Sequence, residues 1–126
     1  MTPDGETYKD RPGDGPLGTA ISNAVVQVTR QYTGRGPTQS KTYVNRDAVT
    51  VVLQDTLTTG EHNLVAAGES AHVSQTRKLL QRAMRDDLVM AVERLTKRNV
   101  VAFMSDSSIE PDFAIEAFVL ESLPRE

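Results

Sequence analysis

Tyr32-Thr33-Gly34-Arg35-Gly36-Pro37 is the stretch that separates the first helical pattern of this chain from its first strand. Upstream, apolar residues recur every three or four positions, as on the buried face of a helix. These residues are Leu17, Ile21, Ala24, Val25, Val28 and Tyr32. Gly34 can adopt the left-handed conformation that ends a helix, and Pro37 prevents continuation. The pattern therefore predicts a helix that ends at Gly34 and leads into extended chain.

Two short strands and a short helix are predicted after this stretch. Residues 42–44 and 49–53 are rich in β-branched side chains, and Asn45-Arg46-Asp47 between them supplies turn residues. Thr58 and Glu61 have the spacing of a capping box, in which hydroxyl and carboxylate each accept from a backbone amide. We therefore expect a helix that begins at Thr58.

The second half of the chain predicts one long helix followed by a strand pair. Apolar residues step by three, four and seven between about residues 69 and 97, and Asn99 is a plausible stop. Residues 100–104 and 113–120 read as strands, and residues 105–112 read as a polar loop interrupted by Pro111.

The element order α-β-β-α-α-β-β predicts an α+β, two-layer domain. Two hairpins separated by helices form one four-stranded antiparallel sheet with the helices on one face. The other face is expected to carry Thr42, Thr50, Val52 and Glu116, subject to strand register, and to suit a homodimer. The domain is expected to span residues 17–121, between a flexible N-terminal tail (1–16) and a C-terminal tail (122–126).

Composition excludes several classes of function. The chain has 126 residues, a formal charge of −3 with mixed signs, and no cysteine. The mixed charge argues against a nucleic-acid surface, and the missing cysteines exclude disulfides, thiolate metal sites and a cysteine nucleophile. No apolar run approaches the ~20 residues of a membrane span, and no signal peptide is recognisable. A cytoplasmic protein is expected.

Arg35, flanked by Gly34 and Gly36, is one candidate for binding an anion. Two glycines free the backbone amides, and the guanidinium supplies a fork of donors. However, the loop follows the negative end of a helix dipole, which disfavours anions. The structural interpretation, a cap and turn with Arg35 paired locally, is therefore preferred. Arg77 is the second anchor considered for the same ligand-binding function.

Arg77, Lys78, Arg82 and Arg85 share one side of the predicted long helix. Such a face can contact an acidic protein, an anionic membrane or nucleic acid. Nearby Asp86, Asp87 and Glu93 offset it, so a solvated, salt-bridged face is the preferred interpretation. Lys78, Arg82 and Arg85 remain the candidates for binding a protein partner.

Catalytic and metal-binding arrangements are not recognisable. His62 and His72 lack a metal-binding spacing and are interpreted as surface residues. Asp106, Ser107 and Ser108 have no histidine nearby in sequence to act as a base. We therefore predict no enzyme activity, no catalytic residues, no metal site and no cofactor.

The ordered motifs resemble the MpsC-like domain family. The stretches that carry the resemblance are Ile21-Ser22-Asn23-Ala24, Gly34-Arg35-Gly36-Pro37, Leu57-Thr58-x-x-Glu61-x-x-Leu64, the helix around Arg77, Val100-Val101 with Ser105-Asp106, and Phe118-Val119-Leu120. They extend from about Leu17 to Leu120. The resemblance implies a soluble component of a sodium-translocating, membrane-potential-generating system, without established binding or catalytic residues.

Three functions follow from this sequence, in order of preference. The first is a non-catalytic accessory or regulatory subunit that acts through protein contacts, as a homodimer, with a membrane transport subunit as a further partner. The second is a small-ligand or anion-binding module using Arg35 and Arg77. The third is nucleic-acid binding through the basic helix face, which the charge balance disfavours, so no nucleic-acid partner is expected.

Overall fold

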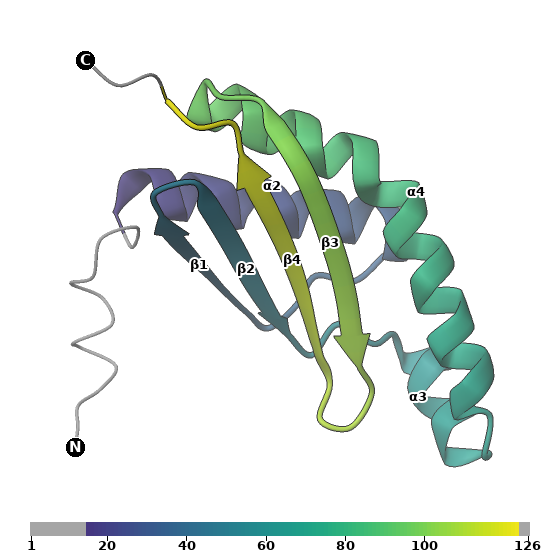
Figure 1. The fold of residues 1–126 in the computed structure, drawn as a ribbon. Helices are drawn as coiled ribbons and strands as arrows, with labels where there is room; N and C mark the ends of the chain where they lie inside the picture. Colours follow the sequence, from purple (N-terminus) through teal and green to yellow (C-terminus); the bar gives the residue numbers. More distant parts are fainter. Residues whose placement is uncertain (1–14, 124–126) are drawn as a thin grey trace.

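The computed structural model describes residues 15–123, which form a two-layer α+β fold (Figure 1). The elements, in chain order, are α2 (Pro16–Thr33), β1 (Gln39–Asn45), β2 (Ala48–Gln54), α3 (Thr59–Ala66), α4 (Ser70–Thr96), β3 (Val100–Ser108) and β4 (Phe113–Leu120). The predicted order α-β-β-α-α-β-β is confirmed. Apart from Gly15 and Pro16, the predicted N-terminal tail lies outside the described residues, as do residues 124–126 of the C-terminal tail.

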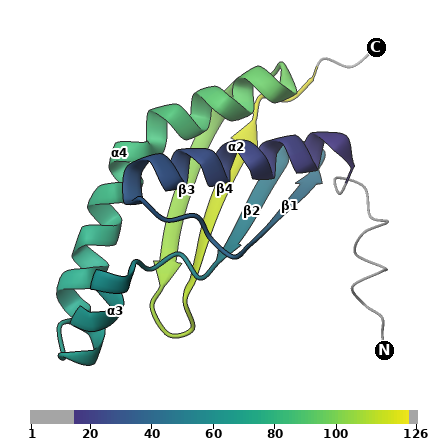
Figure 2. The same cartoon turned by 180° about the vertical axis from the view of Figure 1, so that it is seen from behind.

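The four strands form one antiparallel sheet in the order β1-β2-β4-β3. β1 pairs with β2 and β3 pairs with β4, so each forms a hairpin. The two hairpins join where β2 lies beside β4, with Val51 opposite Glu116. Helices α2 and α4 cover one face of this sheet, while the other face has no helix over it (Figures 1 and 2). The prediction of helices on one face only is confirmed for the described residues.

The core lies between the helices and the inner face of the sheet. Alternation along a strand sends every second side chain to that face. The fully buried apolar side chains include Ile21 and Val25 of α2, Val49, Val51 and Leu53 of β2, Leu88 and Val92 of α4, and Phe118 of β4. Together they fill the space between the two layers, and α2 and α4 also pack against each other.

The register corrects part of the predicted outer face. Thr42 and Glu116 are both buried on the inner face, because each lies opposite Val51 in the neighbouring strand β2. Thr50 and Val52 lie on the outer face as predicted, because they alternate with Val51 along the strand. Thus Thr42 and Glu116, two of the three polar residues expected to face outward, lie beneath the helices instead.

The predicted helix ends are mostly observed. Gly34 adopts the left-handed conformation (φ 77°) and its N–H donates to the Arg30 carbonyl at 2.8 Å, which confirms the predicted C-cap. Thr58 and Glu61 form the complete capping box of α3. α4 spans Ser70–Thr96, close to the predicted range of about 69 to 97, and Lys97 in the left-handed conformation (φ 60°), rather than Asn99, is its C-cap.

β3 is longer than predicted. It continues through Ser108, since Ser105, Asp106, Ser107 and Ser108 all pair with residues of β4. The loop predicted for residues 105–112 is therefore only four residues long, and Asp106, Ser107 and Ser108 belong to a strand. Hydrogen bonds along the ladder outweigh the low strand propensity of these polar residues.

Arg98 closes one end of the sheet. Its Nη1 donates to the carbonyl of Arg46 at 3.0 Å and its Nη2 pairs with Asp47 at 2.5 Å, within the β1–β2 turn. Its Nε also donates to the carbonyl of Glu121, just beyond β4, at 3.2 Å. One side chain therefore holds the turn of the first hairpin against the end of the second. Within residues 15–123, no helix has the combination of length and apolarity needed to cross a bilayer.

Candidate functional site

Arg77 lies inside the protein rather than on the basic face of α4. It is 3% exposed, and its Nη1 donates to Glu61 Oε1 at 3.2 Å and to the Thr56 carbonyl at 3.5 Å. The same Glu61 oxygen accepts from the backbone amide of Thr58 at 2.9 Å. Arg77 therefore joins α4 to the start of α3, and the expectation that it belongs to a solvated face is wrong.

Asp112 extends this buried polar network to the β3–β4 loop. Its Oδ1 accepts from the amide and hydroxyl of Thr56, at 2.9 and 3.1 Å, and its Oδ2 accepts from the Leu57 amide at 3.0 Å. The exposed His62 ring lies 3.7 Å from Oδ2. Both oxygens of the carboxylate thus hold two loops together.

Glu116 is a buried carboxyl group next to this network. It is 1% exposed, and its Oε1 has no hydrogen-bond partner among the described residues. Burial raises its pKa to about 7, because the charged form loses its hydration, while the neighbouring Ser105 hydroxyl and the Arg77 guanidinium oppose that shift. The Ser105 hydroxyl lies opposite in the ladder but does not reach hydrogen-bonding geometry with it. Glu116 is therefore partly protonated near neutral pH.

The loop around Arg35 is explained by local contacts. Arg35 Nε donates to the Asp55 carbonyl at 3.1 Å, and the Thr33 hydroxyl donates to the Arg35 carbonyl at 2.9 Å. At Gly36, a Cβ atom would lie 2.7 Å from the guanidinium of Arg30, so glycine lets this side chain pack against the backbone. These contacts support the structural interpretation of Gly34, Arg35 and Gly36 over the ligand-binding one.

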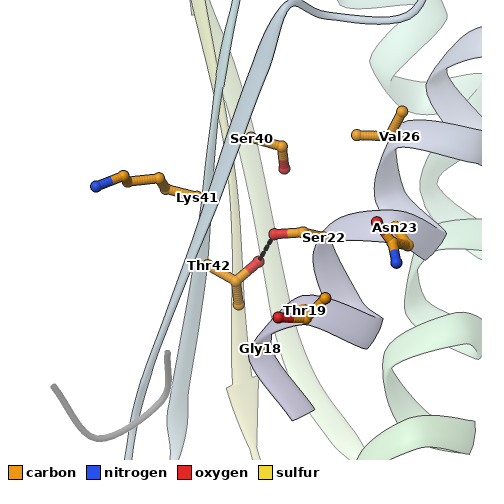
Figure 3. Close-up of a pocket in the computed structure, with 8 residues that line it drawn as sticks. All are labelled: Gly18, Thr19, Ser22, Asn23, Val26, Ser40, Lys41 and Thr42. Atoms are coloured by element: carbon orange, nitrogen blue, oxygen red, sulfur yellow. Dashed lines mark hydrogen bonds between the residues drawn. The ribbon is translucent and has the colours of Figure 1, made fainter. Parts of the chain in front are cut away.

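A shallow pocket of about 290 Å³ lies between the start of α2 and the edge strand β1 (Figure 3). Across it, the Ser22 and Thr42 hydroxyls form a hydrogen bond of 2.6 Å. Lys41 lies on the same strand, but its side chain extends away from α2 (Figure 3). The remaining polar groups in the lining are neutral, so this pocket offers no charge to select a ligand.

A second depression, which we call the basic groove, lies between α4 and β3. It has a volume of about 390 Å³ and is lined by Lys78, Gln81, Arg82 and Arg85 of α4 and by Phe103, Ser105 and Asp106 of β3. None of the three basic side chains forms an ion pair with any residue in the range 15–123. The predicted salt bridges to Asp86, Asp87 and Glu93 are absent there: Asp87 accepts from Tyr32 Oη and Glu93 from the Val100 amide.

The uncovered face of the sheet, called the outer face below, exposes several apolar side chains. On this face, Ile115 of the central strand β4 is 41% exposed, and Met104 of the edge strand β3 is 56% exposed. The ladder aligns its side chains in rows across the four strands. The rows are Gln39-Gln54-Phe113-Ser108, Lys41-Val52-Ile115-Asp106, Tyr43-Thr50-Ala117-Met104 and Asn45-Ala48-Val119-Ala102.

The structure thus separates the predicted site residues into two groups. Arg35 and Arg77 have structural contacts, whereas Lys78, Arg82 and Arg85 come together along the basic groove. Gln81, Ser105 and Glu116 were not predicted as site residues. For Glu116, the sequence holds one indication of burial. It lies two and four residues before the strongly apolar Phe118 and Leu120, so all three side chains point to the same face of the strand.

Comparison with known proteins finds a matching family and a curated relative. The family described as Na⁺-translocating membrane potential-generating system (MpsC) matches residues 14–122. An uncharacterised protein of Bacillus subtilis (strain 168), YbcI, is 28% identical over 107 residues, which cover 84% of this chain and 86% of YbcI. No solved structure matches the chain significantly.

Proposed function

The chain belongs to the MpsC family, and we propose that it is a non-catalytic accessory subunit that acts through protein contacts made by its outer face. The observation that carries this proposal is a four-stranded sheet with helices on one face only. Apolar side chains on such a face are stabilised when a partner covers them. The family description refers to a Na⁺-translocating system. We therefore propose two partners in turn: a second copy of this chain, and a subunit of a membrane transporter that replaces it.

The first proposed partner is a second copy of this chain. If two outer faces stack about a two-fold axis parallel to the strands, β1 lies over β3 of the other copy and β2 lies over β4. Each row then meets itself in reverse order, so that Lys41 lies over Asp106 and Val52 over Ile115. A two-fold interface requires this kind of self-complementarity. Packed sheets are rotated by about 30°, which shifts the ends of the rows more than their centres.

The size of the outer face sets the expected strength of this contact. Four strands of about eight residues give a face of roughly 20 by 25 Å, or about 500 Å². A standard stable interface buries about 800 Å² per partner. We therefore expect a dimer that dissociates on dilution, which leaves the face available for a heterologous partner.

Sedimentation velocity over a range of concentrations tests this function. The Ile115→Asp variant places a charge at the centre of the outer face and is expected to be monomeric. Met90→Asp is the matched control, because Met90 is an exposed apolar residue on α4, away from the sheet. A wild-type chain that stays monomeric at the highest concentrations, or equal dissociation of both variants, would exclude the self-association.

A second measurement addresses the membrane partner. Immobilised wild-type chain is incubated with detergent-solubilised membranes of its own source, and Ile115→Asp serves as the comparison. The proposal expects a transporter subunit, identified by mass spectrometry, that is retained by the wild type and by Met90→Asp but lost with Ile115→Asp. Retention of the same proteins by all three chains would show that the outer face does not make the contact.

A further inference from the structure

The basic groove presents three cationic side chains on one wall. Lys78, Arg82 and Arg85 are spaced by four and three residues on α4, so their side chains follow one another along the same side of the helix. Asp106 also lines the groove, but its ladder position places its side chain on the outer face, where its Oδ1 accepts from the Ser107 amide at 2.8 Å. The lining residues therefore have a formal charge of +2, and their one carboxylate does not lie on the α4 side of the sheet.

A buried donor without a partner lies in the same lining. Gln81 is 8% exposed, yet its Nε2 makes no hydrogen bond to any described residue. The buried Oγ of Ser105, across the groove, lies beside the Glu116 carboxyl group without a hydrogen bond of full geometry among the described residues. Buried polar groups in folded proteins are almost always paired, so the Gln81 donor indicates a partner that comes from outside the chain. Its position between uncompensated cations indicates that this partner is an anion.

The second wall fixes one of the cations. The Arg85 guanidinium lies over the Phe103 ring, with its Cζ 5.6 Å from the ring centroid. This cation–π contact restricts the guanidinium without using its N–H donors, which remain available to a ligand. A site whose donors are held in place before binding loses less conformational entropy when a ligand arrives.

We infer that the basic groove binds a phosphomonoester group, with Arg82 and Arg85 as the charged donors and Gln81 and Ser105 as neutral donors at its base. A phosphomonoester carries about −1.5 to −2 charges near pH 7 and three strong acceptor oxygens, which matches the excess of positive charge and the number of donors. A carboxylate has one charge and two oxygens, so it would leave more of these donors unpaired. The volume of about 390 Å³ accommodates a small organic group in addition to the phosphate.

Titration calorimetry with the full chain, in a low-salt buffer free of phosphate, tests this inference. The probes are glycerol phosphate in one arm and phosphatidylcholine vesicles doped with phosphatidic acid in the other, because both present the same phosphomonoester chemistry. Saturable binding that weakens with added salt supports the inference in either arm. Binding in solution identifies a free metabolite, and binding to vesicles alone identifies a lipid headgroup.

Matched variants connect the binding to the groove. Arg82→Ala is expected to weaken binding by about tenfold or more, as loss of a charge-assisted hydrogen bond does. Arg94→Ala is the control. It removes the same charge from an exposed position in the last turn of α4, outside the lining of the groove. Gln81→Leu is expected to weaken binding without lowering the melting temperature, because it removes an unpaired buried amide.

Two outcomes would overturn the inference. One is the absence of binding by the wild type in both arms at low salt. The other is an equal loss of affinity in Arg82→Ala and Arg94→Ala, which would show attraction by overall charge rather than by the groove. The test is independent of self-association, because Ile115→Asp is expected to bind the phosphomonoester as the wild type does.

Discussion

Arg77 and Glu61 form an ion pair inside the protein, with 3.2 Å between Nη1 and Oε1 and both side chains almost completely shielded from solvent. Glu61 is also the residue that completes the capping box of α3. One carboxylate therefore stabilises the start of one helix and neutralises a cation from the next. Removal of the cation leaves a buried negative charge whose remaining partners are the amide and hydroxyl of Thr58.

Arg77→Met is expected to lower the free energy of unfolding by about 3–5 kcal/mol, the usual cost of breaking a buried ion pair on one side. Urea denaturation followed by circular dichroism measures the loss. The double variant Arg77→Met/Glu61→Gln is expected to recover part of it, since the amide keeps the cap acceptor without the charge. No recovery in the double variant would show that packing of the arginine, rather than its charge, is what stabilises the fold.

Asp112→Ala removes the acceptor of three hydrogen bonds that join the β3–β4 loop to Thr56 and Leu57. We expect a loss of about 2–4 kcal/mol, because two backbone amides lose a charged acceptor in a partly buried site. Hydrogen exchange is expected to accelerate at these two amides. Glu110→Ala, an exposed acidic residue in the same loop, is the control and is expected to change little. Equal stability of the two variants would contradict the assigned role.

Glu116 is expected to make the protein less stable as the pH rises through neutrality. An unperturbed glutamate has a pKa of 4.5, whereas burial raises that of Glu116 to about 7. Between these values the folded state keeps a proton that the unfolded state has lost, so the free energy of unfolding falls as the pH increases. A difference of about 2.5 units corresponds to a loss of about 3 kcal/mol.

Glu116→Gln provides the test of that pH dependence, because the amide resembles the protonated carboxyl. Urea denaturation at about pH 5 and about pH 8 is expected to show a smaller decrease for the variant than for the wild type. Asp47 does not interfere: its hydrogen bond to Arg98 lowers its pKa, so its contribution is lost only as the pH falls below the ordinary range of aspartate. Parallel curves for variant and wild type would rule out Glu116 as the source.

A charge exchange tests the proposed stacking of two outer faces. Lys41→Glu and Asp106→Lys are each expected to weaken dimerisation by about 2–5-fold per contact, and the contact occurs twice in a two-fold dimer. The double variant is expected to dimerise like the wild type, because each new charge again lies over its opposite. Sedimentation equilibrium measures all four chains. Additive weakening in the double variant would argue against this orientation of the two copies.

The element order was predictable because the helical repeats are long and because Gly34 and Thr58 mark helix ends with definite chemistry. The faces of β4 were not predictable, since Phe113, Ile115 and Val119 are as apolar as the alternating set that includes Phe118. Since apolar side chains alternate on both faces of β4, only its pairing with β2 decides which face is buried. Glu116 is expected on the outer face, subject to strand register, and its pairing with Val51 places it inside.

The basic groove shows a different limit of sequence reasoning. The spacing of Lys78, Arg82 and Arg85 predicted one helix face, but its opposite wall comes from β3, a separate element. Asp87 and Glu93 are close enough in sequence to neutralise this face, but both have other partners. Asp87 accepts from the Tyr32 hydroxyl, and Glu93 accepts from the Val100 amide. Which carboxylate accepts which donor is fixed by tertiary contacts, so the uncompensated charge of the groove was not predictable.

The strand order β1-β2-β4-β3 also affects how the chain is made. Val51 and Glu116, paired at the centre of the sheet, are 65 residues apart in the sequence. During synthesis the first hairpin leaves the ribosome well before β4, so Val49, Val51 and Leu53 gain their final neighbours only after β4 has been made. Such distant pairing slows folding and prolongs the exposure of apolar strands. The nascent chain is therefore expected to need protection by chaperones until β4 emerges.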